Sequence, residues 1–179
     1  YIPEIAGARF YGHAGSQGDA VRWGEELGAA LGDMDSYQSH GGLTVDGDVP
    51  VPWAHILRGG VQVNAHGRRF SDETKNYAQR ALEVLAQPGG YVWSLYDGAI
   101  DAELQGFAPY RAVVDCGAVL TASSTDDLKR QTGLPAEIGA TLQEITRSAA
   151  DGAPDSFGRT FARGLTPPFK AVKVTGVLY

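Results

Sequence analysis

The most informative part of the chain is residues 59–73, which read Gly59-Gly60-Val61-Gln62-Val63-Asn64-Ala65-His66-Gly67-Arg68-Arg69-Phe70-Ser71-Asp72-Glu73. Alternating apolar residues predict a strand here, followed by a tight turn and a second short strand. The acidic residues that follow cap a predicted helix over residues 72–85, which carries Tyr77. The stretch therefore places a basic pair, a carboxylate and a phenol where a sheet meets a helix. The pair Arg68-Arg69 is also compatible with a solvated turn.

The composition is that of a soluble globular protein, with 43% hydrophobic and 20% charged residues in a chain of 179. A net charge of -6 argues against nucleic acid as the main partner. No apolar run reaches the roughly 18 residues that a membrane span needs, and nothing resembles a signal peptide. Cys116 is the only cysteine, which suits a reducing compartment, so we expect a cytoplasmic location.

The remaining pattern mixes helices and strands without a regular β-α-β order. We expect helices over residues 19–31, 97–104, 125–132 and 135–149, and strands over residues 34–39, 91–96, 113–119 and 169–174. The first of these strands would end at His40, because Gly41-Gly42 predicts a break. The sequence thus predicts an α+β fold, with a mixed sheet, hairpins and packed helices.

Several common kinds of site are missing from the sequence. No Gly-x-Gly-x-x-Gly follows a strand, and neither a phosphate-binding loop nor a Gly-x-Ser-x-Gly elbow is present. The four histidines lack the short spacing of a metal site, so we expect no metal.

Two groups remain as candidates. Residues 15–19 open a predicted helix, where free backbone N–H groups suit an anion, although the local sequence favours a simple helix cap. His40 and Tyr77 form the second group, because an imidazole and a phenol can polarise a carbonyl or move a proton. Each of the two is also compatible with a purely structural role.

Three segments, residues 18–31, 33–40 and 61–73, carry motifs in an order known from one family. They are similar to a "GDG…A…GA.L" helix, a "DM…Q.HP" strand and a "V…G.RF.NE" hairpin. In these motifs the chain resembles the flavoprotein subunits of succinate dehydrogenases and fumarate reductases, a family that includes the ketosteroid dehydrogenases. Three matches in order are far more specific than any one of them.

The resemblance implies a domain organisation and a cofactor. Residues 34–179 would form the capping domain, which is α+β and closes over the flavin, and residues 1–33 would be a remnant of the FAD-binding domain. FAD would be bound in the full-length protein, because this chain lacks the FAD fingerprint. On the cofactor side, the resemblance assigns Ser16, Gly18 and Asp19. The partner that it implies is the rest of the flavoprotein chain.

The resemblance also assigns site residues. His40 matches a substrate-contacting histidine, and Glu73 matches the glutamate of the "NE" pair. Tyr77 stands where fumarate reductases have a proton-donating arginine and where ketosteroid dehydrogenases have a tyrosine in the same region. We therefore expect Tyr77 and His40 to be catalytic. The expected substrate-binding residues are Trp53, Glu73, Arg69 and Arg80, and either arginine is a candidate for lowering the pKa of the Tyr77 phenol.

The expected function follows from these positions. Pro52-Trp53 replace the Thr-Glu pair of fumarate reductases, which makes that wall apolar, and a dicarboxylate needs cationic clamps. The chain is thus expected to belong to an FAD-dependent oxidoreductase that dehydrogenates or reduces a C–C bond next to a carbonyl, with an apolar carbonyl compound as substrate. The alternative is a binding or interaction module without chemistry.

Overall fold

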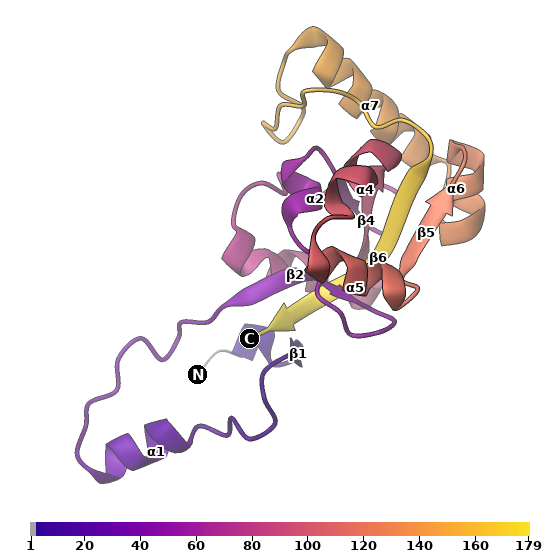
Figure 1. The fold of residues 1–179 in the computed structure, drawn as a ribbon. Helices are drawn as coiled ribbons and strands as arrows, with labels where there is room; N and C mark the ends of the chain where they lie inside the picture. The colour runs from indigo at the N-terminus through magenta and orange to yellow at the C-terminus, as the bar shows by residue number, and fades with distance from the viewer. Residues whose placement is uncertain (1–2) are drawn as a thin grey trace.

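The sheet is built around the last strand, β6 (Phe169–Leu178), in the computed structural model, which describes residues 3–179 (Figure 1). Four strands pair with β6: β1 (Arg9–Phe10) in parallel, and β2 (Ser39–Thr44), β4 (Tyr91–Asp97) and β5 (Val119–Ala122) antiparallel. A further strand, β3 (Val61–Val63), pairs with β4. Because β1 and β2 both pair with Val177, they flank the C-terminal end of β6.

Helices connect these strands and cover the sheet. Within residues 3–179 they are η1 (Pro3–Ile5), α1 (Asp19–Glu26), α2 (Ala54–Leu57), η2 (Tyr77–Gln79), α3 (Arg80–Leu85), η3 (Pro88–Gly90), α4 (Gly98–Leu104), α5 (Ala108–Asp115), α6 (Thr125–Thr132) and α7 (Glu137–Asp151). The predicted helices over residues 97–104, 125–132 and 135–149 correspond to α4, α6 and α7. The α+β class is therefore confirmed.

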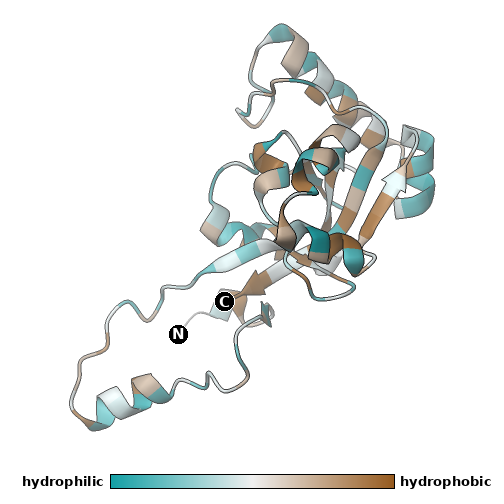
Figure 2. Ribbon diagram, in the orientation of Figure 1, coloured by the Kyte–Doolittle hydropathy of each residue, from teal (hydrophilic) through white to brown (hydrophobic). Residues whose placement is uncertain are grey.

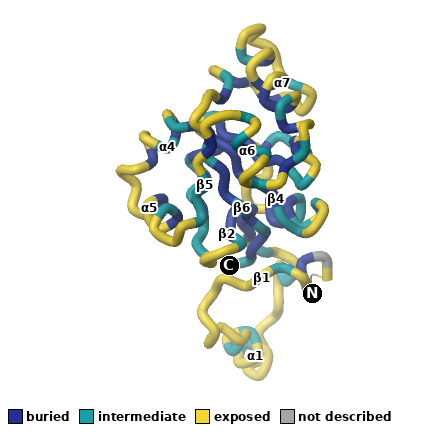
Figure 3. The backbone as a smooth tube through the Cα atoms, turned by 90° about the vertical axis from the view of Figure 1, so that its right-hand side faces the viewer, coloured by how far each residue is buried: buried dark blue, intermediate teal, exposed yellow. Residues whose placement is uncertain are grey.

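The core lies where β4 and β6 meet the helices. Leu95 and Val172 from these strands are buried together with Ile138 and Ile145 from α7. Apolar residues follow β6 along most of its length in Figure 2, and the same strand is buried in Figure 3. Full burial of one such side chain stabilises the fold by about 1.5–3 kcal/mol. These buried residues therefore contribute much of the stability of the domain.

Two glycines allow α3 to approach the sheet closely. A Cβ atom at Gly176 of β6 would lie 2.7 Å from the carbonyl oxygen of Ala81, and one at Gly41 of β2 would lie 2.5 Å from Cγ of Arg80. The strand does not end at His40 as predicted, since β2 continues through Gly41 and Gly42, but its pairing with β6 shifts register between His40 and Leu43. The strand predicted over residues 34–39 is also wrong, because the chain turns after Asp33, where φ is 52°.

The helix predicted over residues 72–85 begins later than expected. Asp72 caps a turn, accepting hydrogen bonds from the backbone N–H and the hydroxyl of Thr74, and Asn76 adopts a left-handed conformation with φ 52°. The helical segment therefore starts only with η2, whose first residue is Tyr77. Within the described residues, no second strand follows the hairpin turn. The turn is closed by a hydrogen bond from the backbone N–H of Asn64 to the carbonyl of Arg68.

The strand predicted over residues 113–119 is wrong as well. Residues Ala108–Asp115 form α5, which has a proline in its first turn, where a missing N–H costs nothing. Gly117, with φ 77°, reverses the chain after this helix, and β5 begins only at Val119.

Residues 11–38 project away from the sheet as one long excursion (Figures 1 and 3). Its helix α1 contains no buried residue, and it ends at Glu26 rather than at residue 31 as predicted. Trp23 is 57% exposed and Leu27 is 88% exposed. This excursion therefore contributes no core of its own.

Over residues 3–179, no helix has the length and apolar character that crossing a membrane requires. The same residues contain no group of three or more His, Cys, Asp and Glu side chains that is placed to hold a metal ion. Cys116 is unpaired and exposed.

Candidate active site

Three aromatic rings from separate parts of the chain meet near the C-terminal end of β6. They belong to His40 in β2, Trp53 just before α2, and Tyr77 in η2. The ring centroid of His40 lies 5.4 Å from that of Trp53 and 5.4 Å from that of Tyr77. The ring centroids of Trp53 and Tyr77 are 5.5 Å apart. All three pairs are edge-to-face, which is an attractive arrangement for aromatic rings. These residues are called the three-ring cluster below.

His40 is held rigidly by the sheet, because it lies opposite Val177 in the β2–β6 pairing. Its side chain is buried, and burial lowers the pKa of the imidazole to about 4. The ring is therefore neutral at physiological pH and can donate one hydrogen bond and accept another. Its Nδ1 atom has no hydrogen-bond partner among the described residues. Tyr179 adds a fourth ring, 6.3 Å from that of His40.

Trp53 is positioned by the short helix α2. It is the residue from which α2 starts, and its buried Nε1 has no hydrogen-bond partner among residues 3–179. His55 packs behind it with the ring centroids 6.0 Å apart and is fully buried. Burial lowers the pKa of His55 to about 4, and the 2.8 Å hydrogen bond from Nδ1 to the carbonyl of Pro52 offsets this only in part. Two neutral histidines thus flank the indole.

Tyr77 is the most accessible member of the three-ring cluster, with 42% of its surface exposed. It follows the left-handed residue Asn76, and the next residue, Ala78, accepts a 2.6 Å hydrogen bond from the hydroxyl of Ser39. Partial burial raises the pKa of the phenol, so the hydroxyl is protonated at physiological pH. In this form Tyr77 is a proton donor.

Arg69 and Glu73 form a buried ion pair. The Glu73 carboxylate accepts hydrogen bonds from Arg69 Nε at 2.8 Å and Nη2 at 2.7 Å, from Arg159 Nη1 at 2.7 Å, and from the backbone of Gln62 at 3.1 Å. Arg69 also pairs with Asp155. Burial acts to raise the pKa of Glu73, but the hydrogen bonds and charges of the two arginines outweigh it and hold the pKa below its usual range. We call these four charged residues the buried ion network.

Arg80 is also buried. Its Nε donates to the side-chain oxygen of Gln62 at 3.0 Å, and its Nη1 contacts Ser71 and Glu83. Its guanidinium stacks over Phe70, with 4.7 Å between Cζ and the ring centroid. Arg69 and Arg80 therefore bind protein acceptors, although Nη2 of Arg80 is buried without a hydrogen-bond partner among the described residues. Burial alone accounts for the raised pKa of Tyr77.

The residues expected on the cofactor side lie elsewhere, in the projecting segment. Gly18 precedes α1 in a left-handed conformation, and no side chain caps this helix. Asp19 pairs with Arg22 at 2.5 Å, and the backbone N–H of Ser16 donates to the carbonyl of His13. The structure thus brings together His40, Trp53 and Tyr77, and it leaves Ser16, Gly18 and Asp19 on a separate exposed segment.

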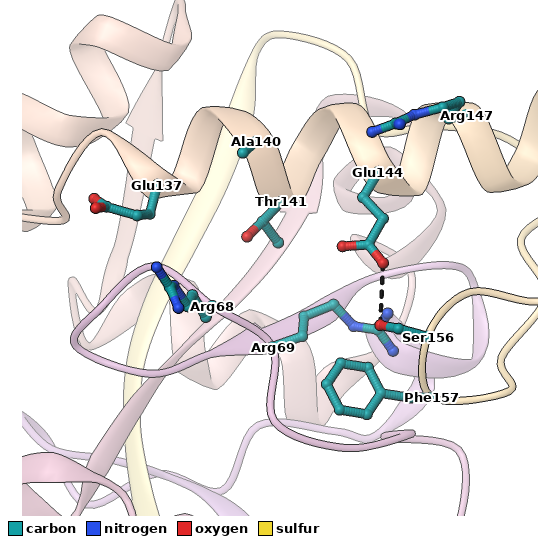
Figure 4. A pocket seen from close by; sticks show the side chains of 9 residues that line it. All are labelled: Arg68, Arg69, Glu137, Ala140, Thr141, Glu144, Arg147, Ser156 and Phe157. Carbon is teal, nitrogen blue, oxygen red and sulfur yellow. Dashed lines mark hydrogen bonds between the residues drawn. The ribbon is translucent and has the colours of Figure 1, made fainter.

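A separate pocket of about 370 Å³ lies between the hairpin turn and α7 (Figure 4). Arg68 and Arg69 line it from the turn, and Glu137 and Glu144 line it from α7. No member of the three-ring cluster belongs to its wall. The basic pair of the hairpin therefore faces α7 rather than the three rings.

Sequence reasoning missed part of the site. Arg159 and Asp155 were not expected, and each contacts a partner 86 positions away along the chain. The segment around them carries turn residues but no local signal of a distant carboxylate or guanidinium. His55 and Tyr179 were also missed, because a lone His or Tyr says nothing about its neighbours in space.

Known proteins share this fold and are similar to parts of this sequence. No family profile matches the chain. It is 30% identical over 132 residues to the fumarate reductase (cytochrome) of Shewanella frigidimarina, a match covering 74% of this chain and 23% of that protein. Its homologues are fumarate reductases and 3-oxosteroid dehydrogenases. They include the NADH:fumarate oxidoreductase of Klebsiella pneumoniae, 27% identical over 97% of this chain and 19% of that protein.

The 3-oxosteroid 1-dehydrogenase of Mycobacterium tuberculosis is 27% identical over 83% of this chain and 29% of its own length. The chain thus spans between 19% and 29% of these relatives and corresponds to one part of longer proteins.

Solved structures agree on the fold. An open conformation of a flavocytochrome c3 fumarate reductase matches 98% of this chain with a TM-score of 0.82 and 24% identity, over 31% of that chain. A 3-ketosteroid Δ1-dehydrogenase from Sterolibacterium denitrificans matches 95% of this chain with a TM-score of 0.69 and 20% identity, over 37% of that chain. The α+β arrangement described above is therefore the fold of one region of these proteins.

Proposed function

We propose that residues 34–179 form the capping, substrate-facing domain of an FAD-dependent oxidoreductase, with residues 1–33 belonging to its FAD-binding domain. The reaction would dehydrogenate or reduce a C–C bond next to a carbonyl. The three-ring cluster carries this proposal, because it joins an accessible phenol to a neutral imidazole in a fold shared with fumarate reductases and ketosteroid dehydrogenases.

The projecting segment fits a contact with FAD held mainly by another part of the protein. The first-turn N–H groups of α1 have no side-chain cap, and helix N-termini of this kind suit phosphate or carbonyl oxygens. Gly18 leaves room for close approach, and Ser16 and Asp19 flank it. A flavin, when bound, supplies hydride transfer. The rest of the flavoprotein chain would be the partner that covers this segment.

Within this reaction the chain's own residues handle the proton and the carbonyl. The protonated phenol of Tyr77 would donate a proton to the carbon next to the one that receives hydride, and in the reverse direction it would take that proton back. His40 would hold the substrate carbonyl by a hydrogen bond from its neutral ring. Trp53 would shape the pocket beside both.

An apolar carbonyl compound fits this arrangement better than a dicarboxylate. A dicarboxylate is usually bound by guanidinium groups. Here Arg69 and Arg80 are buried and hydrogen-bonded to Glu73 and Gln62, which supports a substrate that these guanidiniums do not hold, although Nη2 of Arg80 has no hydrogen-bond partner among residues 3–179. We also propose a cytoplasmic location, which the single unpaired Cys116 supports.

The test is Tyr77→Phe in the full-length protein, with Tyr91→Phe as the matched control on β4. Turnover of 4-androstene-3,17-dione with a dye acceptor, and of fumarate with a reduced dye, would be measured for each variant. We expect Tyr77→Phe to lose at least 100-fold in kcat on the better substrate, because general acid–base groups contribute about 10²–10⁴-fold. Near-normal turnover would remove Tyr77 from the mechanism.

A further inference from the structure

Two members of the three-ring cluster come from segments that lie outside the sheet. His40 is fixed by strand pairing, but Trp53 precedes the four-residue helix α2, and Tyr77 follows the irregular residues 70–76. The spacing of 5.5 Å between the rings of Trp53 and Tyr77 therefore depends on contacts made by side chains.

One side chain joins both segments. Arg159, in the loop between α7 and β6, donates from Nη2 to the carbonyl of Ile56 at 2.8 Å and from Nη1 to that of Gly60 at 2.9 Å. Ile56 lies at the end of α2 that is opposite to Trp53, and Gly60 directly precedes β3. The same Nη1 donates to Glu73 at 2.7 Å, four residues before Tyr77. One buried guanidinium thus holds the end of the Trp53 helix and the start of the Tyr77 segment.

The loop that carries Arg159 is organised for this contact. Asp155 accepts hydrogen bonds from the backbone N–H groups of Phe157 and Arg159, both at 2.9 Å, and it also pairs with Arg69. Figure 4 shows Phe157 beside Arg69, and the dashed line marks the 3.0 Å hydrogen bond from Ser156 to Glu144 of α7. The loop is therefore anchored to the hairpin and to α7 just before Arg159.

We propose that Arg159 is a positioning residue that sets the separation and orientation of Trp53 and Tyr77. The inference rests on the proposed function for its catalytic consequence, but the positioning itself is independent of any reaction. A guanidinium is required, because a planar fork reaches three acceptors at once whereas a lysine ammonium on a flexible stem does not hold the same geometry.

The first experiment measures positioning in this 179-residue chain by NMR. The indole N–H signal of Trp53 is assigned with Trp23→Phe and Trp93→Phe, since the chain has three tryptophans. Arg159→Lys should shift the Trp53 indole and the Tyr77 ring signals while cooperative unfolding is kept. The control Arg163→Lys alters a loop arginine that pairs with Asp97 instead, and it should leave both signals in place. Unshifted signals in Arg159→Lys would overturn the proposal.

The second experiment measures the consequence in the full-length flavoprotein. Arg159→Lys should lower kcat about 10- to 100-fold with KM changed less than 3-fold, because a displacement of about 1 Å is enough to cost 10²-fold in rate. Flavin content and melting temperature serve as checks on folding. A loss of folded protein with unchanged kcat for each bound flavin would assign Arg159 a purely structural role and refute positioning.

The variant Tyr77→Phe, measured in parallel, distinguishes failure of the positioning role of Arg159 from failure of the proposed function. If Tyr77→Phe is inactive and Arg159→Lys has normal kcat, the positioning role fails while the proposed function stands. If Tyr77→Phe is active, the proposed function fails, and the NMR result alone decides the positioning. Should Arg159→Lys fail to fold, Glu73→Gln, which keeps one acceptor oxygen and a similar volume, replaces it and should shift the same two signals.

Discussion

Removal of the Glu73 carboxylate should destabilise the fold strongly. In the buried ion network two carboxylates, Glu73 and Asp155, balance two guanidiniums, Arg69 and Arg159, and each of these side chains is at most 5% exposed. Glu73→Ala deletes the acceptor of four hydrogen bonds and leaves a net positive charge in the interior. The remaining partners satisfy only part of the two guanidiniums.

The expected loss follows from this geometry. Breaking a buried ion pair by removing one partner costs about 3–5 kcal/mol, because the other charge stays buried without compensation. Glu73→Gln keeps one acceptor oxygen and loses charge-assisted hydrogen bonding, so we expect about 2–3 kcal/mol. The control is Glu103→Gln, which breaks a pair with Arg58 whose side chains are 61% and 49% exposed, and it should cost about 0–1 kcal/mol.

Urea unfolding at pH 7, followed by circular dichroism, measures these changes. With an m value of about 2 kcal/mol/M, Glu73→Ala should lower the urea midpoint by about 2 M. A loss below about 1 kcal/mol, comparable with that of Glu103→Gln, would refute the reasoning. It would mean that Arg69 and Arg159 find water or other acceptors at little cost.

The same network predicts a pH dependence. The pKa of Glu73 in the folded chain lies below its ordinary value of 4.5, so its stabilisation is fully present above that value and is lost as the pH falls through the folded pKa. The difference in unfolding free energy between wild type and Glu73→Gln should therefore shrink below about pH 4.5. A difference that stays constant from pH 7 to pH 3 would contradict the charge-based account.

Two further predictions concern the two buried histidines and a glycine of the sheet. His40 and His55 have pKa values of about 4 against 6.5 in an unfolded chain, so the unfolded state binds more protons between these pH values. Stability should fall by about 1.4 kcal/mol per pH unit for each histidine as the pH drops from 6.5 to 4, and NMR titration midpoints near 6.5 would disprove this. Gly176→Ala should cost about 1–3 kcal/mol in a urea titration, because its Cβ meets the backbone of Ala81, whereas Gly106→Ala, with open space around it, should not destabilise.

The sequence predicted the elements whose signals are local. The predicted helix over residues 125–132 matches α6, which Ser124 and Gly133 cap. The predicted strands over residues 91–96 and 169–174 match β4 and the first part of β6. Elements set by tertiary contacts were predicted wrongly. The pair Gly41-Gly42 has the local signal of a break, but it lies within β2, where α3 packs against Gly41 and the register with β6 shifts.

The candidate site shows the same division. The motifs predicted that His40 and Tyr77 belong to one site, and the structure places their ring centroids 5.4 Å apart. The roles of Arg69 and Arg80 could not be predicted from the sequence, because the sequence does not reveal whether an arginine side chain faces solvent or a buried carboxylate. Only the fold shows that the acceptors of Arg69 include Asp155, 86 positions away.

The buried ion network is charged whereas the three-ring cluster is uncharged, and this difference bears on the kind of substrate that fits. The charged groups of the buried ion network hold the fold, with Glu73 between Arg69 and Arg159. The cluster itself is uncharged at neutral pH, because His40 stays neutral and Tyr77 stays protonated. An anionic substrate would have to leave water without gaining a countercharge from these residues, which is costly. A dicarboxylate would therefore need cationic groups beyond the buried ion network, whereas a neutral carbonyl compound needs none.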